Sequence, residues 1–310
     1  MGDPTGVGPE VTLKAIEQID LPVDILVIGS VSIIDETKAR YNIKWNGEVL
    51  NCVDIDKSDI EYGKPSRVAG KCAYESILKG YELVAQREID ALVTAPICKA
   101  SISFILPSFS GHTELLANLA GVEKFAMMLV GDTLRVTLVT THISIKEVAR
   151  SLDTDDIVSK VELTHQFLSQ KLRINSPKIG VCALNPHGGE EIFGDEEKRV
   201  IIPAIEKVKS MGIDVSGPYP ADTVFIDHGA PTTNKFDAIV SMYHDQGMIP
   251  LKIKEFGNAV NVTLGLPFVR TSPDHGTAFD VAGKGIANPT SMIKAIKLAI
   301  KLAQPHIKDG

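Results

Sequence analysis

The stretch Ile179-Gly180-Val181-Cys182-Ala183-Leu184-Asn185-Pro186-His187 sets the pattern from which the fold follows. An apolar run of strand length ends in a polar turn, and a histidine stands directly after the turn. Because apolar and polar residues do not alternate within the run, both faces of the strand are expected to be buried. A strand of this kind, with polar groups at its carboxyl end, is typical of a parallel sheet in an α/β protein.

Similar apolar runs recur along the chain, and helical patterns lie between many of them. Further strands are expected at residues 23–28, 89–93, 125–130, 136–139, 238–242 and 260–264. Helices are expected at residues 10–18, 156–172, 196–211 and 291–302. This alternation predicts an α/β fold with largely parallel sheets covered by helices on both faces.

Composition narrows the class of protein. The chain has 310 residues, of which 44% are hydrophobic, and this is enough for two α/β lobes. The formal net charge of -7 offers no basic field to nucleic acid. No apolar run approaches the ~20 residues of a membrane span, and no signal peptide is recognisable, so a cytoplasmic protein is expected. The four cysteines form no CxxC pair, which argues against a disulfide framework or a zinc ribbon.

The first residues, Gly2 to Glu10, form a glycine-rich turn that leads into a helix with Pro9 in its first turn. Such a turn normally follows a strand, and no strand precedes it in this sequence. We expect either that the start is assigned too late or that a segment has been lost. The absence of the strand would affect the stability of the fold.

Three histidines follow three of the expected strands, and these are His142, His187 and His244. In an open parallel sheet, reactive groups collect at the carboxyl ends of the strands. One such histidine alone is more often a polar loop residue, but three alike favour a shared divalent metal. Three imidazoles leave coordination positions open for substrate oxygens, which is the catalytic rather than the structural pattern.

A glycine-rich segment, Asp274 to Pro289, precedes the last expected helix. It lacks the GxGxxG spacing of a Rossmann turn and resembles the loop that wraps the adenosine of NAD(P) in isocitrate and isopropylmalate dehydrogenases. Taken alone, it could also be a plain connection between elements. The residues that the resemblance assigns to cofactor binding are His275, Gly276, Thr277, Gly283 and Asn288.

A series of motifs in the same order, nearly from end to end, is similar to the 4-hydroxythreonine-4-phosphate dehydrogenase family of vitamin B6 biosynthesis. The motifs stand at residues 2–10, 94–99, 111–114, 140–142, 184–190, 217–223, 242–247 and 261–272. Gly188 departs from the family pattern, which has alanine after the histidine.

This resemblance implies a two-lobed α/β/α sandwich of the isocitrate/isopropylmalate dehydrogenase-like superfold. Residues 1–110 with 265–310 would form a first lobe that carries the cofactor loop. Residues 111–264 would form a second lobe with the metal ligands and the dimer interface. The resemblance also implies a homodimer whose active site is shared, so that some of the ligands His142, His187 and His244 come from the partner subunit.

The implied substrate-binding residues are His112, Thr113, Lys252, Asn261 and Arg270. Arginine offers a planar fork to an anionic group and lysine a point charge. Two carboxylates were considered for proton transfer, Asp245 and Asp222. Asp245 could instead orient an imidazole, and the choice of general base stays open.

The activity that the resemblance implies is an NAD-dependent oxidation of the 3-hydroxyl of 4-phosphohydroxythreonine, followed by decarboxylation to an amino-ketone phosphate. NADP is possible, and the divalent metal would be zinc or else magnesium, manganese or cobalt. Relatives that act on 4-phosphoerythronate, 4-phosphothreonate or a cyclic dihydrodiol dicarboxylate share nearly all the motifs. From other classes, we consider a phosphotransacetylase-like acyltransferase and a catalytically retired metabolite-binding protein.

Overall fold

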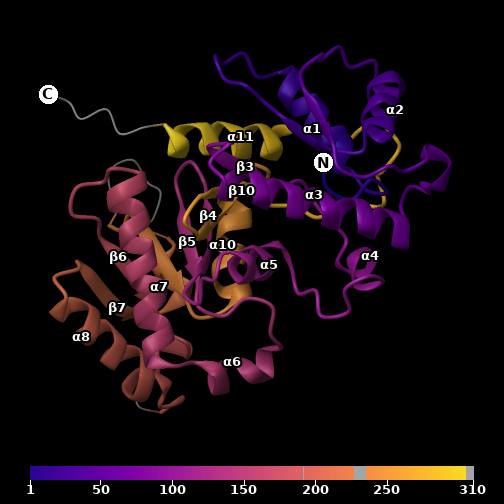
Figure 1. The fold of residues 1–310 in the computed structure, drawn as a ribbon. Helices are drawn as coiled ribbons and strands as arrows, with labels where there is room; N and C mark the ends of the chain where they lie inside the picture. Colours follow the sequence, from indigo (N-terminus) through magenta and orange to yellow (C-terminus); the bar gives the residue numbers. More distant parts are fainter. Residues whose placement is uncertain (191, 227–234, 305–310) are drawn as a thin grey trace, which may run out of the picture. The chain divides into compact units, whose positions relative to one another are not determined.

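The computed structural model describes residues 1–190, 192–226 and 235–304. The chain divides into two compact units. The first unit consists of Met1–Gly121 and Leu266–Gly310, and the second of Val122–Gly265. Figure 1 shows the ribbon of both.

The first unit is built from two short pieces of parallel sheet and the helices around them. Strand β1 pairs with β2, and β3 pairs with β10, each in parallel. Its strands are β1 (Val27–Gly29), β2 (Val49–Asn51), β3 (Ala91–Val93) and β10 (Val269–Pro273). Its helices are α1 (Gly8–Glu17), α2 (Val31–Tyr41), α3 (Arg67–Ala85), α4 (Lys99–Ser103), α5 (His112–Leu119) and α11 (Thr290–Ala303).

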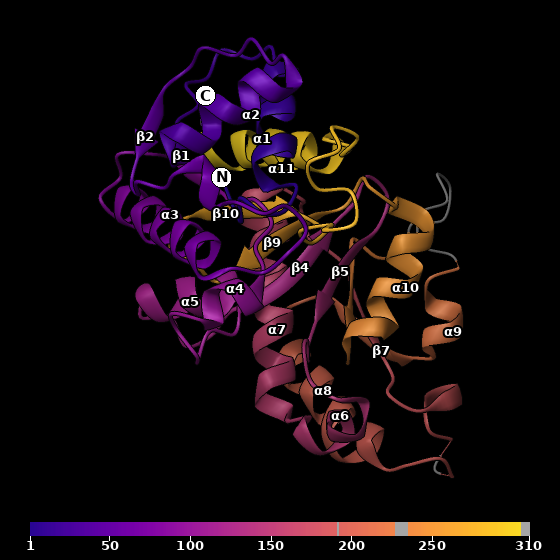
Figure 2. The ribbon, with the colours of Figure 1, turned by 90° about the vertical axis from the view of Figure 1, so that its right-hand side faces the viewer.

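Helices cover both faces of these strands in the first unit (Figure 2). Helix α3 packs against β1 and β3, and α11 packs against β3 and β10. The 19-residue helix α3 begins where the side chain of Ser66 accepts a hydrogen bond from the backbone N–H of Ala69. Such a cap satisfies one of the free amide groups of the first turn.

The second unit contains a mixed sheet with the strand order β9-β4-β5-β8-β6-β7. Strand β4 runs antiparallel to β5 and β9, whereas β5, β8, β6 and β7 run parallel. The strands are β4 (Ala126–Val130), β5 (Arg135–Leu138), β6 (Ile179–Cys182), β7 (Val215–Tyr219), β8 (Ala238–Ser241) and β9 (Val260–Leu264). The helices are α6 (Ile145–Ser151), α7 (Thr154–Gln166), α8 (Ile202–Ser210), α9 (Ala221–Val224) and α10 (His244–Glu255).

This sheet is covered on one face by α7 and on the other by α10 (Figure 2). The central strands β5, β6 and β8 are almost completely buried, which agrees with the largely apolar sequences of β6 and β8. Every apolar run that was expected to form a strand overlaps one, although in the run at 23–28 only Val27 and Ile28 belong to a strand. The helical pattern at 156–172 is confirmed too, with a π-helical turn at Phe167–Lys171 that closes α7.

Two features differ from the sequence analysis in detail. The boundary drawn at residue 110 lies before α5, but α5 groups with the first unit because Leu116 packs into one apolar cluster with Ile77 and Leu92. The sequence analysis did not predict the antiparallel direction of β4. This strand follows α5 and is joined to β5 by a short turn. In the part of the chain that the structure describes, no helix has the length and apolar character needed to cross a membrane.

Candidate active site

Two of the expected metal ligands, His142 and His244, lie side by side in the second unit. Their ring centroids are 5.9 Å apart. The backbone explains this proximity, because the N–H of Thr140 donates to Met242 O (3.1 Å) and the Thr140 hydroxyl donates to the same oxygen (2.7 Å). Each histidine stands two residues beyond this joint, at the carboxyl ends of the parallel strands β5 and β8.

The third histidine, His187, follows β6, which is the other neighbour of β8. It lies in a 3-10 turn at Pro186–Gly188 with φ 54° and ψ 20°, a left-handed conformation that few residues other than glycine adopt. Its ring contacts Phe193, with centroids 6.3 Å apart. Among the residues that the structure describes, no three His, Cys, Asp or Glu side chains of one chain are grouped as a metal site.

The turn that carries His187 is held by buried polar side chains. Glu197 accepts hydrogen bonds from the backbone N–H groups of Leu184 (2.8 Å) and Asn185 (2.7 Å) and from the Asn185 amide. Burial raises the pKa of Glu197, but these hydrogen bonds outweigh it and hold the pKa below its ordinary value. Gln246 joins the ends of β6 and β8, since it donates to Ala183 O and accepts from Met242 N, both at 2.7 Å.

The two carboxylates considered for proton transfer occupy different surroundings. Asp245 Oδ1 lies 2.7 Å from Nδ1 of His244, a geometry that orients the imidazole and leaves Nε2 available to a ligand. Asp222 is exposed at the start of the short helix α9. The contacts of the described residues therefore give Asp245 an orienting position and define no role for Asp222.

In the first unit, Arg270 and Thr94 form a buried polar pair. Arg270 on β10 is 2% exposed and donates from Nε (3.1 Å) and Nη2 (2.7 Å) to the hydroxyl of Thr94. Burial lowers the pKa of Arg270 to about 10, so the guanidinium still carries its charge at neutral pH. A buried cation next to a helix start is well suited to an anionic group of a ligand.

That helix start is the amino end of α5, where His112 and Thr113 stand. Desolvation lowers the pKa of His112 well below its ordinary value of 6.5, and the charges of Arg270, the N-terminus and Lys99 lower it further. His112 is therefore a neutral imidazole at physiological pH. The backbone N–H groups of the first turn, Thr113 and the charged Arg270 together form a group that favours an anion.

Lys252 and Asn261 belong to the second unit. Lys252 lies on α10, with its Nζ 5.9 Å from the centroid of the Phe256 ring. Asn261 lies on β9, and its Oδ1 is buried without a hydrogen-bond partner among the described residues. A buried oxygen left in this state costs free energy unless a ligand satisfies it.

The glycine-rich segment forms an irregular loop before α11. Nε2 of His275 is buried without a described partner, and Nδ1 lies 2.9 Å from Gly276 O. A Cβ at Gly276 would meet no atom within 4 Å, so the backbone there borders open space. Thr277 is anchored to the first turn of the chain because its carbonyl accepts from Val7 N (2.9 Å).

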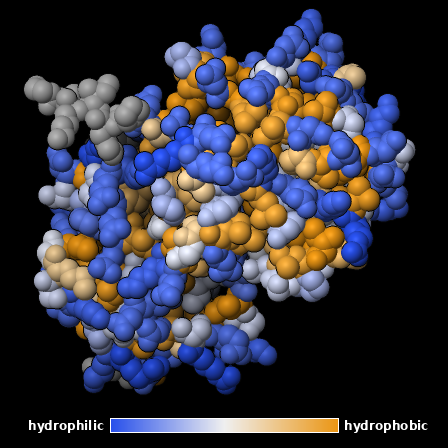
Figure 3. Space-filling model, in the orientation of Figure 1, coloured by the Kyte–Doolittle hydropathy of each residue, from blue (hydrophilic) through white to orange (hydrophobic). Residues whose placement is uncertain are grey.

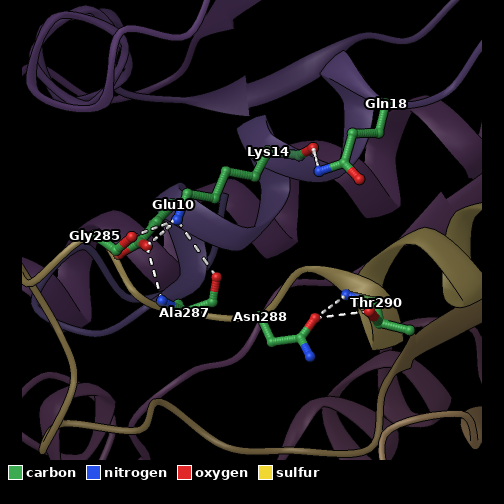
Figure 4. A network of polar contacts seen from close by, with 7 residues as sticks. All are labelled: Glu10, Lys14, Gln18, Gly285, Ala287, Asn288 and Thr290. Atoms are coloured by element: carbon green, nitrogen blue, oxygen red, sulfur yellow. Dashed lines mark hydrogen bonds and ion pairs between the residues drawn. The ribbon is translucent and has the colours of Figure 1, made fainter.

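The second half of the loop is fixed to α1 by two charged side chains (Figure 4). Lys14 Nζ donates to Glu10 (2.6 Å) and to Gly285 O (2.8 Å), and Glu10 accepts from the N–H of Ala287 (3.0 Å). Asn288 caps α11, because its side chain accepts from the N–H and the hydroxyl of Thr290. Asn288 therefore stabilises the start of α11.

Gly283 has φ +77°, and a Cβ there would approach the ring of Tyr62 to 2.9 Å. The position therefore requires glycine, both for the left-handed backbone and for the contact with the ring. Among the cofactor candidates, Gly276 borders open space and His275 carries a ring nitrogen without a described partner, whereas Thr277 packs closely against Gly6. Gly283 and Asn288 shape the loop.

Sequence reasoning did not identify the residues that support these groups, chiefly Thr94, Gln246, Glu197, Glu10 and Lys14. Thr94, Gln246 and Glu10 stand inside motifs that the family resemblance marked, and this was the available signal. Lys14 carried none, because a lysine on an amphipathic helix reads as a solvated residue.

Comparison with known proteins identifies the family of the chain. Residues 5–299 match the family described as pyridoxal phosphate biosynthetic protein PdxA. The chain is 41% identical to a 4-hydroxythreonine-4-phosphate dehydrogenase of Desulforapulum autotrophicum, covering 96% of this chain and 93% of the relative. It is 40% identical to a D-threonate 4-phosphate dehydrogenase of Cupriavidus necator, covering 98% and 96%.

Among solved structures, the 4-hydroxythreonine-4-phosphate dehydrogenase of Klebsiella pneumoniae superposes with a TM-score of 0.83 at 35% identity, and 98% of each chain is covered. The match to the family extends over nearly the whole chain and includes the segments that carry His142, His187 and His244. The chain therefore belongs to the pyridoxal phosphate biosynthetic protein PdxA family.

Proposed function

We propose that this chain is a dehydrogenase that oxidises the 3-hydroxyl of 4-phosphohydroxythreonine with NAD and releases the carboxylate as carbon dioxide. The observation that carries the proposal is the pair of imidazoles, His142 and His244, at the ends of neighbouring strands. Family membership points to the same reaction, because the relatives named above are dehydrogenases of phosphorylated hydroxy acids.

The imidazoles fit a divalent metal, zinc first, with magnesium, manganese or cobalt as alternatives. His142 and His244 would bind it, and His187 would complete the set, with the partner subunit supplying part of the ligands. The strained backbone of His187 supports a functional role at this position. When bound, the metal polarises the substrate hydroxyl and stabilises developing negative charge, while NAD, or NADP, accepts the hydride.

The residues of the chain have separate tasks in this reaction. Asp245 holds the proton of His244 at Nδ1 and so keeps Nε2 as the ligand atom. Arg270, with the neutral His112 and Thr113 at the start of α5, would bind the phosphate or carboxylate. Lys252 and Asn261 would supply a second set of donors and acceptors, and Asp222 is the remaining candidate for a proton acceptor.

The cofactor would lie against His275, Gly276 and Thr277, where the backbone of Gly276 borders open space and a ring nitrogen of His275 lacks a described partner. Gly283 and Asn288 would hold the loop in shape. Glu10 and Lys14 anchor this loop on α1, so they would position it before the nucleotide arrives.

The homodimer is supported by an apolar row formed by α10 and the residue that follows it. Ile249 and Ile253 are 59% and 79% exposed and lie one helical turn apart, and Phe256, directly after the helix, is 81% exposed. Large apolar side chains in a row on one helix face mark an interaction surface. Since α10 begins with His244, a partner on this face would lie close to the proposed metal site.

A substrate panel tests the proposal. The metal-loaded protein is mixed with NAD and, separately, 4-phosphohydroxythreonine, D-4-phosphothreonate and 4-phosphoerythronate, and the formation of reduced nicotinamide is followed. The highest kcat/KM is expected for 4-phosphohydroxythreonine. A clear preference for phosphothreonate would assign the chain to the D-threonate 4-phosphate dehydrogenase activity. The chain is 40% identical to a relative with that name and 41% identical to a 4-hydroxythreonine-4-phosphate dehydrogenase. Acyl transfer to coenzyme A without any nicotinamide reduction would contradict both.

A further inference from the structure

The last residue of α10 is a buried carboxylate, Glu255, to which the proposed reaction assigns no task. Glu255 is 3% exposed. Its Oε1 accepts hydrogen bonds from the N–H of Thr133 (2.6 Å), from the hydroxyl of Thr133 (2.6 Å) and from the N–H of Leu134 (3.2 Å). Both donor residues lie in the turn between β4 and β5. Glu255 therefore joins the end of α10 to the start of β5.

The turn between β4 and β5 has room for this side chain only because it contains a glycine. The N–H of Gly131 donates to Leu134 O (2.9 Å) and closes the turn. A Cβ at Gly131 would lie 2.5 Å from both Cγ and Cδ of Glu255, so a larger residue would displace the carboxylate. Burial lowers the pKa of Arg135, the next residue of β5, and the negative charges of Asp237 and Glu255 oppose this. The buried carboxylate thus has three donors and a cation nearby, and losing them would be costly.

A carboxylate at this position departs from the pattern of the helix. Gly247, Leu251 and Glu255 are buried and stand four residues apart, so they form the stripe of α10 that faces the sheet. An apolar residue would be expected at the third position of such a stripe. Pro250 has no N–H, so the helical hydrogen bond to Gln246 O cannot form in the middle of α10. The placement of the helix therefore depends on its contacts with the sheet.

Helix α10 and strand β5 pack closely along their length, as Figure 2 shows. A Cβ at Gly247 would lie 2.5 Å from Val136 of β5, so the two elements approach as closely as glycine allows. Strand β5 leads toward His142, and α10 begins with His244. The turn, β5, the two imidazoles and α10 thus form a closed path. Glu255 joins the path at one end, and the imidazole pair lies at the other.

We propose that Glu255 is a positioning residue for the metal site, because it fixes α10 along β5 and so holds His244 beside His142. The inference rests on the proposed function, in which these imidazoles bind a divalent metal. Glu255 lies roughly 16 Å of helix length away from His244, so it acts through the helix and not by contact with the ion. A path already joined at Glu255 loses less conformational freedom when the metal binds. By linkage, bound metal should stabilise the turn in return.

The test measures the Kd of the protein for Zn²⁺ in competition with a chromophoric chelator, without substrate or NAD. Glu255→Leu removes the acceptor and makes the buried stripe fully apolar. Glu255→Gln keeps an acceptor oxygen and should rescue the site. Thr133→Val removes only the hydroxyl donor and leaves both N–H donors in place, so it tests the proposal even where Glu255→Leu does not fold.

The matched control is Thr164→Val, on the other face of β5. The hydroxyl of Thr164 lies 2.8 Å from that of Thr137 on β5 and donates to Lys160 O. Thr164 belongs to α7, and the surface over α7 is mainly hydrophilic in Figure 3. This variant removes a buried polar contact of β5 without touching α10, so it shows what a general loss of stability does to metal binding.

Glu255→Leu is expected to raise the Kd for Zn²⁺ about tenfold and Thr133→Val about threefold, whereas Glu255→Gln and Thr164→Val should change it less than about twofold. Zn²⁺ should also slow the hydrogen exchange of the Leu134 amide in the wild type. An unchanged Kd in both Glu255→Leu and Thr133→Val, or an equal rise in Thr164→Val, would overturn the proposal. Equal binding of Zn²⁺ by the wild type and His142→Ala would instead refute the metal site of the proposed function, and the role of Glu255 with it.

Discussion

The rings of His142 and His244 lie with their centroids 5.9 Å apart although the two residues are far apart in the sequence. The joint between Thr140 and Met242 accounts for this, because it aligns the ends of β5 and β8 directly before the two histidines. Asp245 then orients His244. The proposed reaction depends on these two imidazoles, which lie together at the ends of parallel strands in the second unit.

Thr94 is expected to support the anion-binding group. Thr94→Val leaves Nε and Nη2 of the buried Arg270 without this acceptor, which should lower the free energy of unfolding by about 1–3 kcal/mol and raise KM for the phosphorylated substrate about tenfold. Thr94→Ser keeps the hydroxyl and is the matched control. Urea unfolding and steady-state kinetics check the pair, and equal behaviour of the two variants would show that the hydrogen bonds contribute nothing.

His112 predicts a pH dependence of stability. Its pKa is depressed in the folded protein, while the unfolded chain has the ordinary value of 6.5, so the unfolded state binds the proton first as the pH falls. The contribution of the neutral His112 to the free energy of unfolding is fully present above pH 6.5 and is lost as the pH falls below it. The free energy of unfolding then decreases by at most about 1.4 kcal/mol per pH unit. Urea unfolding between pH 5 and 8 of the wild type and His112→Gln measures it. Parallel curves would contradict the assignment.

Lys14 is expected to act on the cofactor loop through the backbone. Lys14→Met removes the hydrogen bond to Gly285 O, which is expected to stabilise the ordered loop by about 1 kcal/mol. The Kd for NAD should therefore rise several-fold, with little change in kcat. Lys38→Met is the control, since Lys38 also faces a carboxylate on its own helix, Asp35. Nucleotide titration and the hydrogen exchange of residues 283–288 without cofactor give two readouts. An unchanged loop in Lys14→Met would argue against the anchoring role.

The apolar row on α10 predicts the oligomeric state. A variant with both Ile253→Asp and Phe256→Asp places charges on the proposed interface, so light scattering should report a monomer. Activity should fall with it because the proposed ligand set is shared between subunits. Ile286→Asp, at an equally exposed position of the first unit, should remain dimeric. A fully active monomer would refute the shared site.

Much of the fold could be predicted from apolar runs, because strands such as β6 and β8 are buried on both faces and have a largely apolar sequence. Helix α3 was not predicted. Gly70 and Gly80 interrupt its sequence, and the structure shows their reason: a Cβ on Gly70 would meet Ser101 O at 1.9 Å. Close approach of this kind depends on the tertiary structure and leaves only an apparent helix breaker in the sequence.

The candidate site was predictable in part for a related reason. Strand ends indicated where His142 and His244 would stand, and parallel pairing of β5 with β8 brings them together. Thr94 and Gln246 could not be assigned, because each acts by contacts with residues distant in sequence, Arg270 and Ala183. A family motif could mark such a residue, but its role required the structure.

The most direct test of the account measures NAD reduction with 4-phosphohydroxythreonine after the metal has been removed and then restored. No turnover is expected without the metal, and a divalent ion should restore it in the wild type and in His165→Ala but not in His187→Ala. Metal content is measured on the same samples, and circular dichroism confirms that they are folded. Turnover in metal-free buffer, or full recovery by His187→Ala, would contradict the claim that these histidines hold the catalytic metal.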